Sequence, residues 1–317
     1  HQGSEAKHEE GLSMAAVLSG HDEAFMSVKQ VAEYLHLNEK KIYALVNEGG
    51  IPATKVTGKW MFPRELVDRW MLDSTHGGLL SDRLVISGGE DPLLYHLIRL
   101  LAQETGPHAL ISFSPTGTRL GLDLLQANRV DVCAIHWGPE RESHLRHPAL
   151  LRQYPQHHQW VLIRAFKREQ GVMIAPCLDG PIQEPSQLFD PGYRWALRQS
   201  GSGAQRFLLE MLGHYGVSRD QLTRPLTALS EREAAAAIAG QRVDVAPGAR
   251  ATAVEFGLGF LPFGWESFDL ALPRGIWFRR LFQDLLAGLK SPPCRSMAEA
   301  LTGYNLEGAG ELVWGDE

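Results

Sequence analysis

The chain has 317 residues, of which 44% are hydrophobic and 21% are charged, and its formal net charge is −6. This is the composition of a globular protein, and the length suits two or three domains. The acidic balance excludes a positive field over the whole surface, so any contact with DNA must come from a local basic patch. Three widely spaced cysteines argue against a disulfide framework or a structural zinc site.

The chain shows no targeting signal. No apolar run reaches transmembrane length and no secretory signal opens the sequence, so we expect a cytoplasmic protein without membrane contact. The first residues, HQGS, read as a tag, and the residues that follow carry only a weak pattern. We therefore expect residues 1–24 to be a tag and a disordered N-terminus.

Residues 25–72 carry the pattern of a small helical module. Ser27 is a favourable N-cap, and apolar residues follow it at helical spacing. After a short turn, Asn38 can cap a second helix, which Gly49-Gly50 ends. Two short helices joined by a three-residue turn have the plan of a helix-turn-helix.

A β-hairpin follows these two helices. Strand-like runs at 53–56 and 59–62 flank Thr57-Gly58, which is a tight-turn signal. Pro63 then begins a third helix. The added hairpin predicts a winged helix-turn-helix.

The segment SVKQVAEYLHLNEKKIYALVNEGGIPATKVTGKWMF resembles the MerR/excisionase-type DNA-binding domain over nearly the whole module. From Met26 to Leu72, seven Lys/Arg stand against five Asp/Glu in an otherwise acidic chain. Lysines and hydroxyls suit contacts to phosphate, although the same lysines would also be ordinary on a solvated helical surface. Trp60 and Trp70 are expected in the core of the module. The expected DNA-contacting residues are Ser27, Asn38, Lys40, Lys41, Tyr43, Lys55, Thr57 and Lys59.

Residues 73–82 have the small and polar composition of a linker. Strands and helices then alternate, an order that predicts a parallel sheet with right-handed crossovers. The predicted strands lie at 83–87, 109–113 and 131–136, and the predicted helices at 92–104 and 118–127.

The second half repeats this order. LLQANRVDVCAIH in the first half and AAIAGQRVDVAPG in the second each read as helix, turn and Val-Asp-Val strand. We therefore expect two similar lobes, with ligand bound at the carboxyl ends of the parallel strands. The predicted strands are 159–164, 171–175, 193–197, GLGFLPF and FDLALP, and the predicted helices run from the SGSG turn to about Leu212, over 231–240 and over 274–290.

Four segments carry a resemblance to the type II periplasmic-binding-protein fold, in the form fused to helix-turn-helix regulators and related to molybdate- and tungstate-binding proteins. The resemblance covers about residues 83–312 and implies an α/β domain with lobe 1 at about 83–165 and 265–312 and lobe 2 at about 166–264. The segments are LVISGGEDPLLYHLIRLL, SFSPTGTRLGLDLLQANRVDVCAIH, RQSGSGAQRFLLEML and AAAAIAGQRVDVAPGARATAVEFGLGFLPFGWESFDLALP.

In such a fold the strand-end loops of both lobes meet at the cleft. Two of these loops run into helices, whose N–H groups favour an anion, and Arg198 can add a bidentate clamp. His136 is also consistent with a structural histidine, and Trp137 with packing between the lobes. The expected ligand-binding residues are Ser87, Gly88, Gly89, Ser114, Thr116, Gly117, Thr118, His136, Trp137, Arg198, Ser200, Gly201, Ser202, Gly203 and Arg206.

The sequence departs from the family pattern at this turn. Relatives usually read Gly-Ser-Gly-Thr-Arg, whereas this chain has Ala204 and Gln205 at the last two positions and Arg206 one place late. Glu231 stands nearest to where relatives tend to carry a histidine, and Ala246 replaces a glycine. These changes weaken the case for a tetrahedral oxyanion. They leave open another small anion, a polar metabolite or a pocket that has drifted.

The sequence carries none of the P-loop, GxSxG or HExxH motifs, so we expect neither an enzyme nor a cofactor. His144, His147, His157 and His158 could bind a metal, but a solvated segment between the lobes is the preferred interpretation. Cys133 is expected in the core.

We expect a one-component transcriptional regulator that binds operator DNA and a small anion, as a homodimer or a higher oligomer. One alternative is a cytoplasmic small-anion-binding protein whose front module contacts protein. A further alternative is an enzyme on a binding-protein fold.

Overall fold

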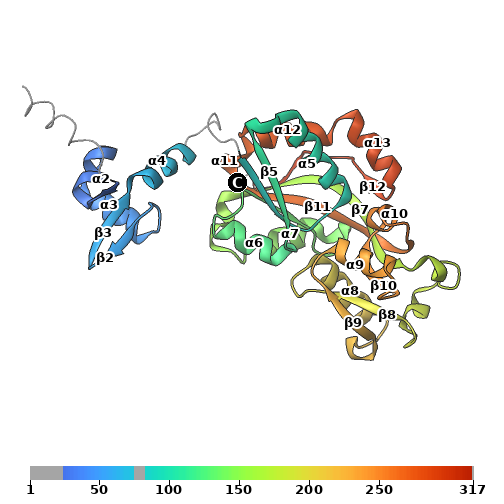
Figure 1. Ribbon diagram of the computed structural model, residues 1–317. Coiled ribbons are helices and arrows are strands. Elements are labelled where there is room, and N and C mark those ends of the chain that lie inside the picture. The colour runs from blue at the N-terminus through green and yellow to red at the C-terminus, as the bar shows by residue number, and fades with distance from the viewer. Residues whose placement is uncertain (1–23, 75–82, 316–317) are drawn as a thin grey trace, which may run out of the picture. The chain divides into compact units, whose positions relative to one another are not determined.

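The computed structural model of the chain describes residues 24–74 and 83–315 (Figure 1). Most of the expected N-terminal tag, and the expected linker from 75 onward, lie outside the described residues. The chain divides into two compact units, His1–His76 and Gly77–Glu317. Each unit has its own hydrophobic core.

Two capped helices open the smaller unit. Helix α2 (Val28–Leu35) follows the N-cap Ser27, whose hydroxyl accepts the N–H of the third helical residue. Helix α3 (Glu39–Asn47) follows Asn38, whose side chain accepts an N–H in the same way. His36 adopts a left-handed conformation and turns the chain between the two helices. Both predicted caps and the short turn are confirmed.

The predicted hairpin is also present. Strand β2 (Thr54–Val56) pairs antiparallel with β3 (Lys59–Pro63), and Thr57 and Gly58 between them both have positive φ, at 49° and 82°. A two-residue turn with positive φ at both positions matches the twist of the strands.

Further elements complete the core of the smaller unit. Strand β1 (Phe25–Met26), which the sequence did not predict, joins the hairpin in the order β1-β3-β2. Helix α4 (Arg64–Asp73) begins after Pro63 as expected and runs one residue beyond its predicted end. Trp60 and Trp70 pack against the core. The buried apolar residues are Met26, Val31, Ala32, Ile42, Ile51, Phe62 and Val67.

One mixed sheet runs through the described part of the larger unit, in the order β5-β4-β6-β11-β7-β10-β8-β9, with β12 and β13 beside β7. β4 pairs parallel with β5 and β6, and β8 pairs parallel with β9 and β10. This confirms the prediction of two lobes that each contain parallel strands. The strands are β4 (Arg83–Gly88), β5 (Leu110–Pro115), β6 (Val132–Ile135), β7 (Trp160–Ile174), β8 (Arg194–Arg198), β9 (Thr223–Ala228), β10 (Val245–Ala249), β11 (Gly259–Pro273), β12 (Tyr304–Asn305) and β13 (Leu312–Trp314).

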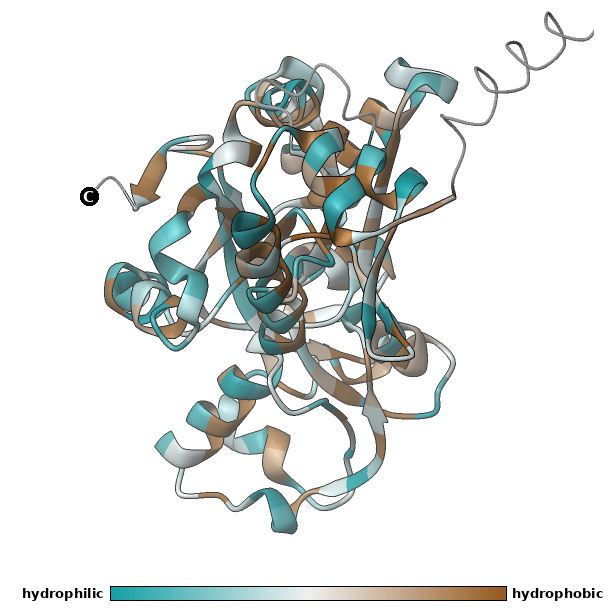
Figure 2. Ribbon diagram, turned by 90° about the vertical axis from the view of Figure 1, so that its left-hand side faces the viewer, coloured by the Kyte–Doolittle hydropathy of each residue, from teal (hydrophilic) through white to brown (hydrophobic). Residues whose placement is uncertain are grey.

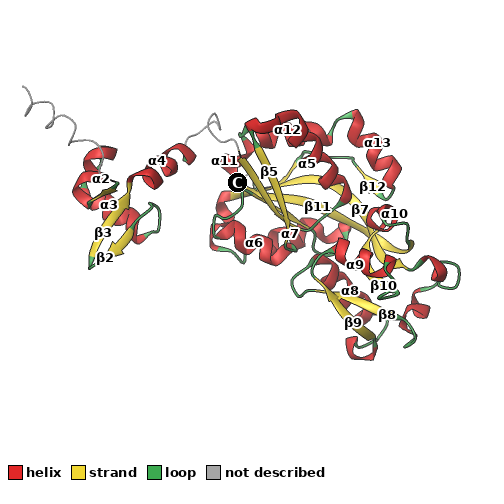
Figure 3. Cartoon of the chain, viewed as in Figure 1, coloured by secondary structure: helices red, strands yellow, loops and turns green. Residues whose placement is uncertain are grey.

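Helices cover both faces of each lobe (Figure 3). In the first lobe, α5, α12 and α13 pack on one face and α6 and α7 on the other. In the second lobe, α8 packs on one face and α9 and α10 on the other. Polar and apolar residues accordingly alternate around the helices (Figure 2). The helices are α5 (Pro92–Thr105), α6 (Thr118–Gln126), α7 (Ser143–Leu151), α8 (Gly203–His214), α9 (Glu231–Ala239), α10 (Arg250–Glu255), α11 (Arg274–Trp277), α12 (Arg280–Leu289) and α13 (Pro292–Leu301).

Two long strands join the lobes. The strands predicted at 159–164 and 171–175 are one strand, β7, and the two predicted returning strands are likewise one strand, β11. The polar residues at 167–170 concealed the continuity of β7, because Arg168 and Gln170 are buried within it. β7 and β11 pair antiparallel along their length and belong to both lobes (Figure 1).

Each long strand contains one bulge. β11 has an extra residue, Phe263, between the partners of Gly171 and Gln170, and β7 has an extra residue, Ala165, opposite the step from Phe268 to Asp269. An extra residue bends its strand and increases the local twist. The two bulges therefore delimit a short segment at the junction of the lobes.

The remaining differences are one divided helix and several elements that the sequence did not predict. The predicted closing helix is two helices, α11 and α12, with Phe278 and Arg279 between them. Strands β9, β12 and β13 and helices α7, α10 and α13 were not predicted.

The repeated Val-Asp-Val has the same role in both lobes. Asp131 accepts the N–H of Val85 through its carboxylate, at 2.8 Å, and donates its own N–H to the carbonyl of Val85. Asp244 does the same with Arg194, with the carboxylate contact at 2.7 Å. Each aspartate thus fixes the start of the central strand of its lobe.

Candidate functional site: the interlobe cleft and the helix-turn-helix surface

The carboxyl ends of the first-lobe strands and the α8 turn of the second lobe meet at a small cavity. Its volume is about 10 Å³, room for about one water molecule. Six residues expected from the sequence line it, together with Glu90, Pro115 and Glu231. The six are Gly88, Gly89, Gly117, His136, Arg198 and Ser202.

Several other expected residues shape the loops and do not line this cavity. The hydroxyl of Ser87 donates to the carbonyl of Gly121, and that of Thr116 accepts the N–H of Gly88. Thr118 is buried, and its hydroxyl contacts the backbone of the third strand-end loop. These hydroxyls hold the first-lobe loops in place.

The remaining expected residues lie around the cleft. Ser114 and Ser200 are exposed. Arg206 pairs with Glu210 at 2.8 Å, and its guanidinium lies 5.8 Å from the ring centre of Trp137. The late position of Arg206 on α8 therefore places it beside Trp137 and not in the cavity.

Gly201 and Gly203 bring the lobes into backbone contact. The carbonyl of Gly201 accepts the N–H of Arg119 in the first lobe at 3.1 Å. A Cβ at Gly203 would lie 2.2 Å from the carbonyl oxygen of His136, so only glycine fits at this approach. The lobes are closed on each other, and this closure leaves the cavity small.

Arg168 in β7 is the centre of a buried charge cluster. Its Nε donates to Glu266 at 2.7 Å, and its Nη1 donates to Asp91 at 3.1 Å and to the carbonyl of Glu90 at 3.0 Å. Asp91 also caps α5 and accepts the hydroxyl of Tyr304. Burial alone would lower the pKa of Arg168, but the surrounding carboxylates outweigh it and raise that pKa.

Glu266 joins this cluster to the cleft. One carboxylate oxygen accepts from Arg168, and the other lies 3.1 Å from Nδ1 of His136, which lines the cavity. Burial would raise the pKa of Glu266, but the charges of His136 and Arg168 lower it to about 2. Glu266 is therefore ionised across the physiological range.

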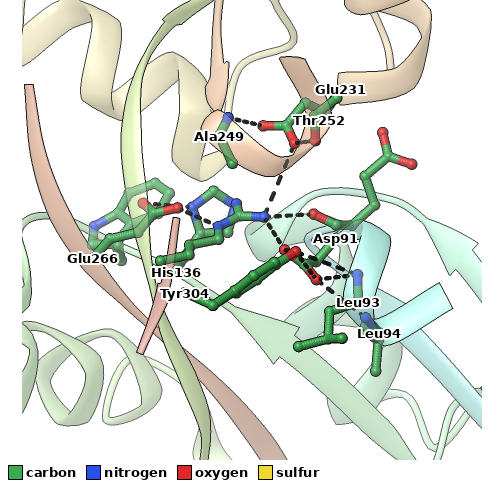
Figure 4. Close-up of polar contacts among 12 residues, drawn as sticks. Asp91, Leu93, Leu94, His136, Glu231, Ala249, Thr252, Glu266 and Tyr304 are labelled. Atoms are coloured by element: carbon green, nitrogen blue, oxygen red, sulfur yellow. Dashed lines mark hydrogen bonds and ion pairs between the residues drawn. The ribbon is translucent and has the colours of Figure 1, made fainter. Parts of the chain in front are cut away.

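Glu231 brings a second-lobe carboxylate to the same place (Figure 4). It accepts the N–H of Ala249 at 3.2 Å and the hydroxyl of Thr252 at 2.6 Å. Its other near neighbour is Nη1 of Arg168, at 4.0 Å. Burial raises the pKa of Glu231, and the charge of Arg168 opposes that effect. Glu231, which stands nearest to where relatives tend to carry a histidine, thus lies at the N-terminal end of α10.

Arg198 offers uncommitted donors to the cavity. Its side chain is buried, and Nε donates to Gln199 at 3.1 Å and to the carbonyl of Ala228 at 3.3 Å. Its two terminal nitrogens have no hydrogen-bond partner in the part of the chain that the structure describes. Burial lowers its pKa, while Glu231 and Glu90 oppose that effect.

Glu90 was not anticipated from the sequence. Its carboxylate accepts the N–H of Arg232 from the second lobe at 2.8 Å and the hydroxyl of Tyr95 at 2.8 Å. Arg168 and Glu266 were also missed. The sequence signal that could have found them is the presence of charged residues within two otherwise apolar segments. Arg168 and Glu266 stand at positions that pair in β7 and β11.

The expectation that the histidine cluster is a solvated segment is wrong for His147. This residue is fully buried in α7, its Nδ1 lies 2.6 Å from Asp269, and its Nε2 accepts the N–H of Trp137 at 3.1 Å. These contacts fix the ring within the first lobe. Among the described residues, no group of histidine, cysteine and carboxylate side chains could hold a metal ion. Cys133 is buried in β6, as expected.

The lysines expected to contact DNA lie on helix α3 and on the hairpin. Lys40, Lys41 and Tyr43 are exposed on α3, and the hairpin presents Lys55 and Lys59. Thr57 is exposed at the tip of the hairpin, whereas Ser27 and Asn38 are engaged as N-caps. A helix and a hairpin with exposed lysines have the form of a nucleic-acid-binding surface.

Comparison with known families adds to this geometry. Residues 25–74 match a helix-turn-helix domain family, and residues 99–290, more than half of the chain, match the PBP superfamily domain. The chain belongs to the PBP superfamily. A helix-turn-helix domain joined to a PBP-like domain is the organisation of a transcriptional regulator with a ligand-sensing part. None of the described helices has the length and apolarity that a membrane span requires.

Solved structures share the fold at low identity. An H2O2-bound mutant of OxyR from Corynebacterium glutamicum aligns with a TM-score of 0.51 at 13% identity, over 87% of this chain and 89% of that one. The regulatory domain of CcmR from Synechocystis PCC6803, in complex with 2-PG, gives 0.45 at 16% identity, over 69% and 95%. The effector-binding domain of QuiR, in complex with shikimate, gives 0.47 at 9% identity, over 69% and 98%. No curated protein matches the chain.

The substitution Arg168→Met tests the charge cluster of the PBP-like domain. It leaves Asp91 and Glu266 buried without their cation, so we expect a loss of about 3–5 kcal/mol in the free energy of unfolding, measured by urea titration. The matched control is Arg224→Met, which breaks an exposed pair with Asp220. We expect the control to cost less than about 1 kcal/mol. Equal losses in the two variants would contradict a central role for Arg168.

Glu266 also predicts a pH dependence. Its pKa falls from an ordinary 4.5 to about 2 on folding, so its stabilisation is complete above pH 4.5 and is lost as the pH drops toward 2. The loss amounts to about 3 kcal/mol at one pKa unit per 1.36 kcal/mol. We expect Glu266→Gln to be less stable than the unmodified protein at pH 7 and to lose less stability between pH 5 and pH 3. Parallel stability curves for the two proteins would refute this assignment.

Proposed function

We propose that this protein is a one-component transcriptional regulator that binds operator DNA through its N-terminal unit and a small polar ligand in the cleft of its PBP-like domain. The observation that carries the proposal is the pairing of a lysine-bearing winged helix-turn-helix with a two-lobed domain in one chain. In this proposal the winged module is of the MerR/excisionase type, as its helix, turn and hairpin order supports.

The DNA contacts are assigned to α3 and the hairpin. Helix α3, as the second helix of the motif, enters the major groove, and the hairpin lies along the adjacent backbone. Lys40 and Lys41 on α3, and Lys55 and Lys59 on the hairpin, neutralise phosphates. Lys55 also lies 5.5 Å from the ring centre of Trp60, which helps to orient it.

The cleft supports a ligand that carries an anionic group. Arg198 and Ser202 line the cavity, and Ser202 is the N-cap of α8. The N–H groups of Gly203 and Ala204 follow directly, and the helix itself leaves them without acceptors. Together they form a site for a carboxylate or a similar anion.

Two carboxylates at the cavity favour a donor on the same ligand. Glu90 and Glu231 both line the cavity. An oxyanion such as molybdate or tungstate, which the sequence resemblance implies, offers these carboxylates no donor and repels them. A zwitterion or a hydroxy acid satisfies both the arginine and the carboxylates. Because the closed cavity holds about one water molecule, such a ligand enters only when the lobes separate.

The regulator acts as a dimer in this proposal. Two helix-turn-helix modules read half-sites about one helical turn apart, and ligand-dependent closure of the lobes changes their spacing. The coupling requires that the ligand bind the two DNA-binding geometries with different affinity.

Salt dependence tests the DNA contacts. The full chain first selects an operator from random-sequence DNA, and its affinity is then measured against salt concentration. We expect Lys40→Ala with Lys41→Ala, and separately Lys55→Ala with Lys59→Ala, to lower the salt slope by about 1 for each phosphate that is no longer neutralised. The control is Lys290→Ala, which lies in the other unit and leaves the slope unchanged. If no operator emerges, the module contacts protein and the DNA-binding part of the proposal fails.

A thermal-shift comparison tests the ligand. Glycine, L-serine, formate, sulfate, molybdate and tungstate are compared, and we expect a zwitterion to raise the melting temperature most, because binding stabilises by mass action. Arg198→Met abolishes the rise, and the bound ligand changes operator affinity. A larger rise with molybdate or tungstate overturns the assignment of ligand class. Unchanged operator affinity at saturating ligand overturns the coupling.

A further inference from the structure

A second and much larger cavity lies where the two lobes and the long strands meet. Its volume is about 350 Å³, which is within the range of small-molecule sites, whereas the closed cleft has room for about one water molecule. Glu266 lines this cavity and also holds His136 of the cleft. The walls of this hinge cavity include Gln170, Phe207, Met211, Tyr215, Phe263 and Trp265.

Gln170 has no hydrogen-bond partner for its amide among the described residues. Its side chain lies on β7 and is only 3% exposed, yet within residues 24–74 and 83–315 neither the amide oxygen nor the amide nitrogen has a partner. A buried amide without partners is destabilising, and such groups are rare in folded proteins. Both amide atoms are shielded from the cavity, so the side chain has to turn toward it before a ligand that supplies one donor and one acceptor side by side can pair with the amide.

Aromatic rings form much of the wall of the hinge cavity. Phe207 of α8 and Phe263 of β11 meet edge to face, with ring centres 5.7 Å apart, and Tyr215 lies 6.5 Å from Phe263. Phe263 is the extra residue of the β11 bulge, and bulges often redirect a side chain beside a functional site. Rings arranged in this way accommodate a flat ligand.

The charges at the cavity are already neutralised. Both oxygens of Glu266 are bound, one to Arg168 and one to His136. Glu210 pairs with Arg146 and with Arg206. Arg141 and His214, which also line the cavity, are exposed to solvent. A charged ligand would therefore find no buried counter-ion.

We propose that the hinge cavity is a second ligand site, separate from the cleft, which binds a neutral aromatic carboxamide or lactam. The ring lies among Phe207, Phe263 and Trp265. The amide edge of the ligand pairs with Gln170, its N–H donating to the glutamine oxygen and its carbonyl accepting from the glutamine nitrogen. The site does not depend on DNA binding or on the identity of the cleft ligand.

The probes are benzamide, acetophenone and benzoate, which share a ring and differ in the polar group. Each is titrated into the full chain by calorimetry or ligand-observed NMR. We expect benzamide to bind about tenfold more tightly than acetophenone, which lacks the donor, and benzoate to bind most weakly because of its charge. Failure of benzamide to bind, as in a cavity that holds only water, overturns the proposal.

Two matched variants separate recognition from stability. Gln170→Met removes the unpaired amide at similar volume, so we expect the melting temperature to hold or rise and the preference for benzamide over acetophenone to disappear. Gln205→Met also replaces a buried glutamine, but one whose oxygen accepts the N–H of Arg198. We expect this control to lower the melting temperature and to keep the benzamide preference. A preference that survives Gln170→Met overturns the proposal.

The half-exposed wall offers a further variant that keeps the core intact. Trp265 is 39% exposed, so Trp265→Ala removes part of the ring contact without opening the interior. We expect benzamide and acetophenone to weaken together, by about tenfold, while their ratio is kept. Unchanged binding of both probes would place them outside the hinge cavity and contradict the proposal.

Discussion

The larger unit depends on one buried cation. Arg168 lies on β7 at the junction of the lobes and binds carboxylates from the start of α5 and from β11. A charge in this position is tolerated only when it is paired, so the first helix and the two long strands are held in one arrangement. Glu231 reaches toward the same guanidinium from the second lobe. The contacts of Arg168 that hold the first lobe together therefore also influence the ionisation of Glu231 at the cleft.

This arrangement separates two kinds of recognition. The proposed cleft site combines Arg198 and His136 with Glu90 and Glu231, so it would discriminate by charge and by the number of donors. The hinge cavity has neutralised charges, aromatic walls and one free amide, so it discriminates by shape and hydrogen bonding. Glu266 touches both, because its carboxylate holds His136 while its side chain lines the hinge cavity. A regulator with both of the proposed sites would have two chemically distinct inputs.

The sequence was informative where the physics is local. The caps Ser27 and Asn38 and the turn at Thr57 act through backbone groups a few residues away, and the predicted helices and hairpin are confirmed. The cleft loops could be anticipated from strand order, because parallel strands end at the same edge of a sheet. Arg168 could not, since a charged residue in an apolar run reads as a break in the strand. Its carboxylate partners come from segments far away along the chain, and only the folded pairing of β7 with β11 brings Glu266 to it.

The two bulges determine how the lobes can move. They lie on either side of the short ribbon that carries Arg168 and Gln170 on one strand and Glu266 on the other. An antiparallel ribbon is stiff where its ladder is regular and yields where one strand has an additional residue. Opening of the domain is then a change of twist at the two bulges, and the regular β7–β11 ribbon between them keeps its shape. Such a change of twist leaves Arg168 and Glu266 paired within the ribbon, and the charge contact that opening removes is the one from Arg168 to Glu231 of the second lobe.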